Sequence, residues 1–152
     1  MTTPAAALEH ELLADIPLAR AMALRVAAYD GDSLTLAAPL APNINDKGCA
    51  FGGSLASLMT LAGWGVIRLA VQARGLDCDI YVQDSTIRYL APVWGDFETV
   101  AHLAEGESFD AFFDALATRG KGRLSVECRV PLAEGGSAAT LSARFVALVK
   151  QS

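Results

Sequence analysis

The loop of residues 45–53 carries the residue types in this chain that are best suited to chemistry. It reads N-D-K-G-C-A-F-G-G and leads directly into a nearly charge-free stretch with helical character, Ser54 to Ile67. The first turn of a helix has backbone N–H groups with no partner inside the helix, and Gly52 and Gly53 let a ligand approach that backbone closely. The helix dipole adds a preference for negative charge. The sequence therefore predicts an anion or oxyanion site that opens onto an apolar core and suits an acyl group.

Polar side chains in and near this loop are candidates for activating a water molecule. Asn45 could hydrogen-bond a water or a carbonyl group, or it could hold the loop in an Asx turn. Asp46 could act as a general base, and the alternative is a solvated loop carboxylate. Asp84 is a second candidate, because a carboxylate in the middle of an apolar strand needs a partner. An ion pair with Arg88 or Lys47 would provide one.

The three cysteines are weaker candidates for catalysis or metal binding than the residues of the loop. Cys49 could be a nucleophile with His102 as its base, but nothing in the sequence brings the two together. Cys128 falls on the apolar face of a predicted strand and is expected in the core. The cysteine spacings match no metal-binding motif, so we expect no metal.

Two further sets of residues are candidates for substrate contact. One stripe of the predicted helix, at 4-3-4 spacing, consists of Gly53, Ser57, Thr60 and Trp64. It would face either a substrate channel or a partner helix. The segment R-G-K-G-R could meet phosphate groups, or it could be a basic edge strand that blocks aggregation. The expected catalytic residues are Asn45, Asp46 and Gly53, and the expected substrate-binding residues are Phe51, Gly52, Ser54, Ser57, Thr60, Arg119, Lys121 and Arg123.

The composition limits the class of protein. With 152 residues, the chain is expected to form one domain, residues 1–152, with a substantial core. Only 19% of the residues are charged and 53% are apolar, so we expect another copy to cover part of the surface. The net charge of −5 and the pI of about 4.9 argue against a nucleic-acid partner. The odd number of cysteines and the lack of a signal-peptide pattern favour a reduced, cytoplasmic setting, and the glycines in the apolar stretch favour a core helix over a membrane span.

Hydrophobic periodicity predicts an α+β fold. The expected elements are a short helix at 4–14, strands at 22–27 and from 34, a long helix to about 73, strands at 80–90 and 97–103, a short helix or packed loop at 109–116, and strands at 121–130 and 138–149. A helix that is apolar all round must be enclosed, and an antiparallel sheet of about six strands curled around it is the simplest solution. The sheet edges would then need cover from self-association.

Two stretches resemble the hotdog-fold thioesterases: N-D-K-G-C-A-F-G-G-S-L at 45–55 and I-R-Y-L-A-P-V-W-G-D at 87–96. The first is most similar to the small thioesterase-like domain found fused behind GNAT acetyltransferases. The resemblance implies a single hotdog domain, in which a curved antiparallel sheet wraps a long central helix, and a dimer or dimer of dimers with active sites at the subunit interface. It also implies hydrolysis of an acyl-CoA or acyl-carrier-protein thioester without metal or cofactor, coenzyme A being part of the substrate. The basic segment would then meet the CoA phosphates.

The chain departs from this family's pattern at two positions. Phe51 stands where the family has a histidine before Gly-Gly, and Thr60 stands where one branch has a catalytic carboxylate. Another branch has an aspartate where this chain has Asn45, which leaves the neighbouring Asp46 as the expected base. These departures keep open a non-catalytic acyl-binding or assembly module. A hydratase or dehydratase is less favoured, because both histidines lie outside the motif.

Overall fold

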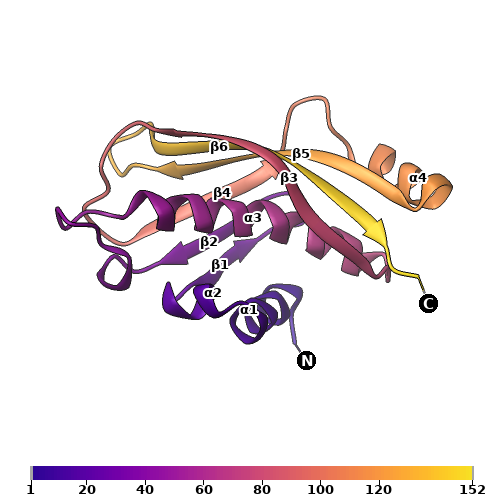
Figure 1. Ribbon diagram of the computed structural model, residues 1–152, viewed down its shortest axis with the longest axis horizontal. Coiled ribbons are helices and arrows are strands. Elements are labelled where there is room, and N and C mark those ends of the chain that lie inside the picture. Colours follow the sequence, from indigo (N-terminus) through magenta and orange to yellow (C-terminus); the bar gives the residue numbers. More distant parts are fainter. Residues whose placement is uncertain (1, 152) are drawn as a thin grey trace.

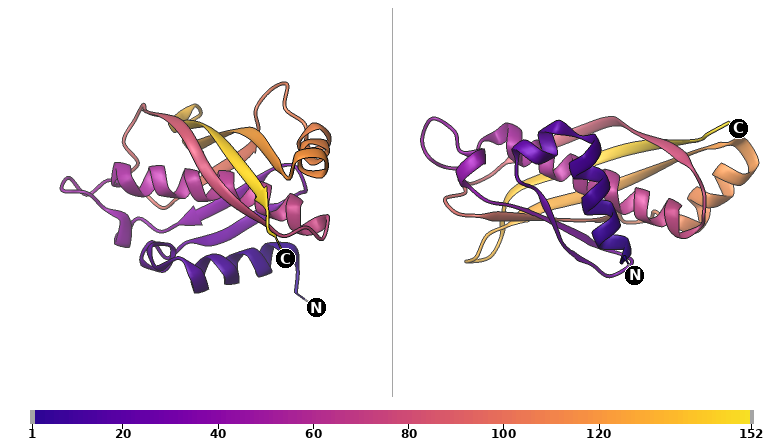
Figure 2. Two further views of the ribbon diagram at one scale, coloured as in Figure 1. Left: turned by 45° about the vertical axis from the view of Figure 1, so that its right-hand side comes forward. Right: turned by 90° about the horizontal axis from the view of Figure 1, so that it is seen from below.

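The chain folds into one antiparallel sheet curved around a long helix, as the sequence predicts (Figure 1). The computed structural model describes residues 2–151. The elements are α1 (Pro4–Asp15), α2 (Pro17–Ala21), β1 (Arg25–Tyr29), β2 (Leu34–Ala38), η1 (Ala41–Asn43), α3 (Gly52–Ala73), β3 (Cys78–Tyr89), β4 (Phe97–Leu103), α4 (Phe109–Arg119), β5 (Lys121–Pro131) and β6 (Ser137–Val149). The six strands lie in the order β1-β2-β4-β5-β6-β3, and α3 lies inside their curve (Figure 2).

The largest difference from the expected starts of the elements is at the first strand. The first strand begins at Arg25, three residues later than expected, because α2 and the left-handed Ala23 (φ 55°) occupy the residues before it. Of the two alternatives left open for the segment that starts at Phe109, the structure shows the helix, α4. The Ser108 hydroxyl caps it by accepting from an amide of the first turn, and Gly120 ends it in the left-handed conformation (φ 70°).

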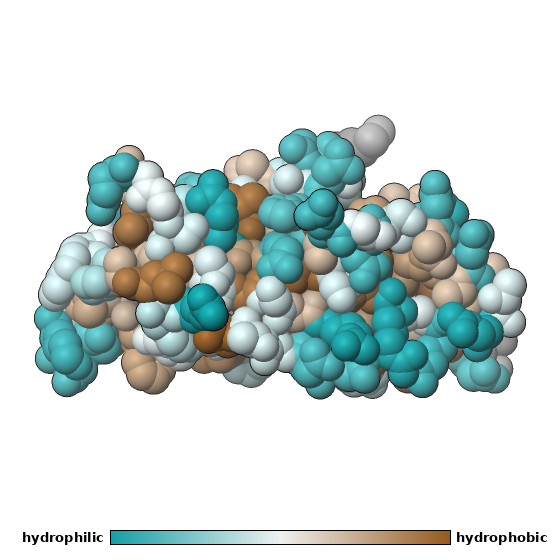
Figure 3. Space-filling model, turned by 90° about the horizontal axis from the view of Figure 1, so that it is seen from above, coloured by the Kyte–Doolittle hydropathy of each residue, from teal (hydrophilic) through white to brown (hydrophobic). Residues whose placement is uncertain are grey.

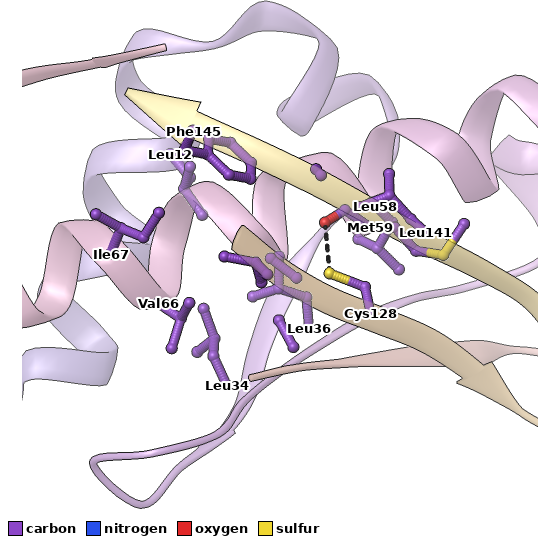
Figure 4. Packing of buried hydrophobic residues seen from close by; sticks show 14 of the residues in the cluster. Leu12, Leu34, Leu36, Leu58, Met59, Val66, Ile67, Cys128, Leu141 and Phe145 are labelled. Carbon is purple, nitrogen blue, oxygen red and sulfur yellow. Dashed lines mark hydrogen bonds between the residues drawn. The ribbon is translucent and has the colours of Figure 1, made fainter. Parts of the chain in front are cut away.

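The core lies between α3 and the inner face of the sheet, with α1 closing one side (Figure 4). A Cβ added at Gly63 would lie 2.9 Å from the buried Phe145 ring, so a glycine is what lets the helix approach the sheet here. The Cys128 thiol is 3.3 Å from the Met59 carbonyl oxygen, which confirms the expected core position. Burial raises the pKa of Cys128 to about 12, so this thiol does not ionise near neutral pH.

The two edge strands of the sheet, β1 and β3, differ in how far other parts of the chain cover them. At the β1 end, the Val26 N–H donates to the Glu9 carboxylate of α1 at 2.8 Å, and α1 is tied to α3 by an ion pair between Glu11 and Arg68 at 2.9 Å. At the other end, β3 is 12 residues long and pairs with β6 alone among the strands of residues 2–151. The β3 edge is therefore open to pairing with another chain.

In length and hydropathy, α3 is the one helix within residues 2–151 that could cross a membrane. More than half of its most apolar window is buried inside this fold, which is the pattern of a core helix.

Replacing Gly63 by alanine tests the contact between helix and sheet. The methyl group would meet the Phe145 ring, and overpacking of about 1–3 kcal/mol outweighs the gain in helix propensity of up to about 1 kcal/mol. We expect a lower free energy of unfolding in urea, followed by circular dichroism at fixed protein concentration. Gly95→Ala is the control, since nothing lies within 4 Å of its added Cβ. Equal stability of the two variants would contradict this account of the packing.

Candidate active site

Backbone hydrogen bonds hold the end of the loop that enters α3. The Ala50 N–H donates to the Val93 carbonyl at 2.8 Å, and the Phe51 N–H donates to the Asn43 carbonyl at 2.7 Å. The Asn43 side chain is 2% exposed and donates to the Met22 carbonyl at 3.0 Å. These contacts fix the direction in which the chain enters the helix.

Asn45 holds the tip of this loop in an Asx turn. Its Oδ1 accepts from the Lys47 N–H at 2.8 Å and from the Cys49 N–H at 3.2 Å, and its Nδ2 lies 3.3 Å from the Cys49 sulfur. Gly48 takes the left-handed conformation that the tight turn requires (φ 87°). The structure therefore supports the Asx-turn alternative for Asn45, and a direct role toward substrate stays a prediction.

Asp46 lies on the outside of the loop. Its side chain is 81% exposed, and Oδ1 is 3.1 Å from Lys47 Nζ. The hydrogen bond and the positive charge from Lys47 lower the pKa of Asp46. None of the hydrogen bonds among residues 2–151 connects this carboxylate to Gly52 or Gly53. Asp46 is thus ionised, and its role as the base stays a prediction.

The N-terminus of α3 presents two donors with no acceptor. Phe51 is the N-cap residue and its side chain makes no capping hydrogen bond. The Ser54 and Leu55 N–H groups both donate to the Phe51 carbonyl. Within residues 2–151, the N–H groups of Gly52 and Gly53 have no hydrogen-bond partner. Two adjacent backbone donors at the positive end of a helix are the arrangement of an oxyanion site.

Two aromatic rings explain why both of these residues are glycines. A Cβ at Gly52 would lie 3.3 Å from the Tyr89 ring, and a Cβ at Gly53 would overlap the Phe51 ring. The Tyr89 hydroxyl also donates to the Gly52 carbonyl at 3.3 Å. Both rings are 55% exposed and flank the two free N–H groups. Tyr89 belongs to the second motif, at 87–96, but only the fold brings β3 beside this end of α3 and so makes Tyr89 part of the candidate site.

The predicted stripe on α3 is a half-buried face of the helix. Gly53, Ser54, Ser57 and Thr60 are all partly exposed, and the Thr60 hydroxyl donates to the carbonyl four residues earlier at 2.8 Å. Trp64 packs and donates from Nε1 to the Ile80 carbonyl at 3.1 Å. The stripe therefore leads from the two free donors along the helix until Trp64 closes it.

Asp84 does not lie in this region. It follows a β-bulge in β3 and pairs across the strands with Arg144, 3.9 Å away, rather than with Arg88 or Lys47 as expected. Its side chain is 62% exposed on the outer face of the sheet, since β3 is an edge strand and not a buried one. The expected ion pair is therefore present, but its partner is Arg144 of the neighbouring strand β6.

The remaining candidates are also dispersed. Cys49 is 6% exposed and held by Asn45, whereas His102 is exposed on β4, so no described contact joins them. The basic segment from Arg119 to Arg123 lies with α4, at the opposite end of the molecule from the loop that precedes α3 (Figure 1). Within one protomer, it does not share a site with Gly53.

A long central helix wrapped by a curved antiparallel sheet is the hotdog fold. The chain matches the family model YiiD_C, "Putative thioesterase (yiiD_Cterm)", over residues 5–149 and belongs to that family.

Solved structures give the same fold. A protein of unknown function from Chlorobaculum tepidum is 32% identical, with a TM-score of 0.88 over 95% of this chain and 93% of that one. A "putative thioesterase" from Shewanella oneidensis is 29% identical, with a TM-score of 0.84 over 95% and 97% of the two chains. PA5026 of Pseudomonas aeruginosa, described as a "Probable Thioesterase", is 23% identical over 99% of both chains, with a TM-score of 0.81, and is similar in fold.

Asn45→Ala tests how the loop is held. The substitution removes the acceptor for two backbone N–H groups, so we expect a loss of about 0.5–2 kcal/mol in the free energy of unfolding and faster amide hydrogen exchange at Lys47 and Cys49. Asn45→Asp keeps the acceptor and should retain most of the protection. Unchanged exchange in the alanine variant would show that the side chain does not hold the turn.

Proposed function

We propose that this protein hydrolyses an acyl thioester of coenzyme A or of an acyl-carrier protein by attack of water. The observation that carries the proposal is the pair of free N–H groups at Gly52 and Gly53, in a chain that belongs to a thioesterase family. The thioester carbonyl oxygen would accept from these donors. Water adds to the carbonyl carbon, the donors stabilise the oxyanion, and the C–S bond then breaks to give a carboxylic acid and a thiol.

Asp46 is the proposed general base. Lys47 lowers the pKa of Asp46, so the carboxylate is ionised at neutral pH but is a weaker base while it is paired with Lys47. The ion pair with Lys47 joins two side chains that are largely exposed, and such pairs contribute little to stability. The carboxylate can therefore leave Lys47 at small cost when substrate occupies the end of α3.

The acyl group would follow the half-buried stripe of α3. Phe51 and Tyr89 provide apolar surface beside the free donors, and Ser57 and Thr60 continue the same face of the helix. Gly52 and Ser54 complete the proposed contacts at the first turn. This arrangement suits a chain that is mainly apolar with a polar group at the thioester end.

Self-association through β3 is part of the proposal. Several exposed large apolar side chains lie on this edge strand or just after it: Tyr81, Val82, Tyr89, Leu90 and Trp94. Figure 3 shows apolar surface toward the end of the molecule where α3 begins. An open 12-residue edge with apolar side chains is a site for pairing with a second strand. A homodimer, alone or as half of a tetramer, would cover it.

A non-catalytic acyl-binding module is the second candidate. Two observations favour it: an apolar ring, Phe51, lies beside the donors, and the Asp46 carboxylate points to solvent. Such a module would bind an acyl-CoA tightly without turning it over.

Hydrolysis of a panel of acyl-CoA thioesters, followed by release of free thiol, tests the leading proposal. If Asp46 is the base, Asp46→Asn should lower kcat by about 10²–10⁴-fold with little change in KM. Lys47→Ala is the matched control. It removes the ion pair but leaves the carboxylate, so kcat should stay within about threefold.

Two outcomes would contradict parts of this proposal. Turnover that is insensitive to Asp46→Asn would remove Asp46 as the base and leave the oxyanion site. Binding of acyl-CoA by calorimetry without hydrolysis of any CoA or carrier-protein thioester would replace the enzyme by the binding module.

The dimer is tested by sedimentation velocity. Wild-type protein should sediment as a dimer or larger assembly at micromolar concentration, and Tyr81→Lys with Val82→Lys should shift it to the monomer, because charges on a shared strand edge repel. Leu18→Lys is the control, since Leu18 is 54% exposed on α2, away from β3. A wild-type monomer would contradict the proposed pairing.

A further inference from the structure

The peptide group between Gly52 and Gly53 carries one of the two free donors of the candidate site. Its carbonyl belongs to Gly52 and its N–H to Gly53, and the two point in opposite directions because the peptide is planar and trans. The Tyr89 hydroxyl donates to this carbonyl at 3.3 Å. Tyr89 therefore contacts the donor peptide from the side opposite to the place where an oxyanion would bind.

The peptide group of the other free donor is held by the helix itself. The Gly52 N–H shares a peptide with the Phe51 carbonyl, which accepts from the Ser54 N–H at 2.9 Å and from the Leu55 N–H at 3.1 Å. In the part of the chain that the structure describes, the hydrogen bond from Tyr89 is the only one from a side chain to either donor peptide.

This turn of the helix depends on contacts from outside it. Glycine has more backbone freedom than any other residue, and two glycines follow each other at the first two positions of α3. A polar N-cap side chain usually binds an amide of the first turn, but the N-cap here is Phe51, which makes no such bond. The Tyr89 hydroxyl thus supplies an outside contact to the most flexible peptide of the turn.

The backbone around Tyr89 is fixed to both the sheet and the loop. Tyr89 is the last residue of β3, which pairs with β6 along its length. The next residue, Leu90, donates its N–H to the Ala138 carbonyl at 2.7 Å. The chain then returns to the loop before α3, where the Ala50 N–H donates to the Val93 carbonyl at 2.8 Å. The hydroxyl is therefore presented to α3 from a held position.

A hydrogen bond to a carbonyl oxygen draws electrons through the peptide and makes its N–H a stronger donor, and the coupling works in both directions. When the Gly53 N–H binds an oxyanion, the Gly52 carbonyl becomes more negative and attracts the Tyr89 hydroxyl more strongly. The present distance of 3.3 Å exceeds the usual O–H···O distance of about 2.7–2.8 Å, so the bond can shorten as charge develops. An interaction that strengthens in the transition state raises kcat rather than lowering KM.

We propose that Tyr89 is a positioning residue, whose hydroxyl orients and polarises the peptide between Gly52 and Gly53 and so strengthens the Gly53 N–H as an oxyanion donor. The inference rests on the proposed function and adds a residue to its oxyanion site. The hydroxyl acts through the peptide and does not contact the reacting carbonyl group.

Magnetic resonance of the free protein tests the hydrogen bond without any need for catalysis. Tyr89→Phe removes the hydroxyl but keeps the ring that packs against Gly52. The Gly52 carbonyl carbon and the Gly53 amide nitrogen should both move upfield, because each is deshielded by a hydrogen bond to that carbonyl. Tyr29→Phe is the control, since Tyr29 lies beside the last turn of α3, and it should leave both signals in place. Unchanged signals in Tyr89→Phe would overturn the proposal.

Kinetics on an acyl-CoA thioester tests the consequence for the reaction. Tyr89→Phe should lower kcat by about threefold to tenfold and change KM by less than about twofold, whereas Tyr29→Phe should change neither. A tyrosine fluorinated beside its hydroxyl is a stronger donor, so at position 89 in slightly acidic buffer it should keep kcat at or above the wild-type value. An unchanged kcat in Tyr89→Phe, or an equal loss in the fluorinated variant, would overturn the positioning role.

Failure of the proposed function gives a different result. If the wild type hydrolyses no thioester, hydrolysis is ruled out, and the two glycine signals still decide whether Tyr89 holds the peptide. The probe is then an acyl-CoA with an isotope label at its thioester carbonyl carbon. Its downfield shift on binding should be smaller in Tyr89→Phe than in the wild type, and equal shifts would overturn the role of Tyr89 toward the bound carbonyl.

Discussion

The burial of α3 is the constraint on which the rest of the structure depends. A helix of this length and hydropathy needs its apolar surface to be buried away from water. The sheet covers it along most of its length. The close approach at Gly63 then fixes the helix against β6, so its first turn is held in one place relative to β3. The free N–H groups at that turn are rigid because the core holds the helix, and a rigid donor pair is what stabilises a charge that develops during reaction.

The two glycines at the start of α3 serve packing and chemistry at once. The rings of Phe51 and Tyr89 occupy the space that a side chain would need, and the same lack of side chains exposes the backbone donors. Close packing and free backbone donors at the Gly-Gly pair are therefore compatible.

The sequence was sufficient for the order of the elements and for the central helix, because hydrophobic periodicity and turn residues are local signals. It was insufficient where the outcome depends on distant contacts. Asp84 was expected to pair with Arg88 or Lys47, but the register of β3 against β6 places it beside Arg144. Tyr89 became part of the candidate site only when the fold brought β3 alongside the first turn of α3. Local turn chemistry did predict the Asx turn at Asn45.

The open edge of β3 is the feature that most directly indicates how a second copy would bind. One copy leaves a 12-residue strand edge unpaired and covers its β1 edge with α1, so the sheet is finished at one end only. One copy also has the free N–H groups of Gly52 and Gly53 and the basic segment 119–123 at opposite ends of α3. A two-fold pairing of β3 edges would complete the sheet and, since it reverses one helix relative to the other, would bring the two ends of α3 together. An isolated copy leaves its 12-residue β3 edge exposed, so completion of the sheet is a physical reason for two copies to pair.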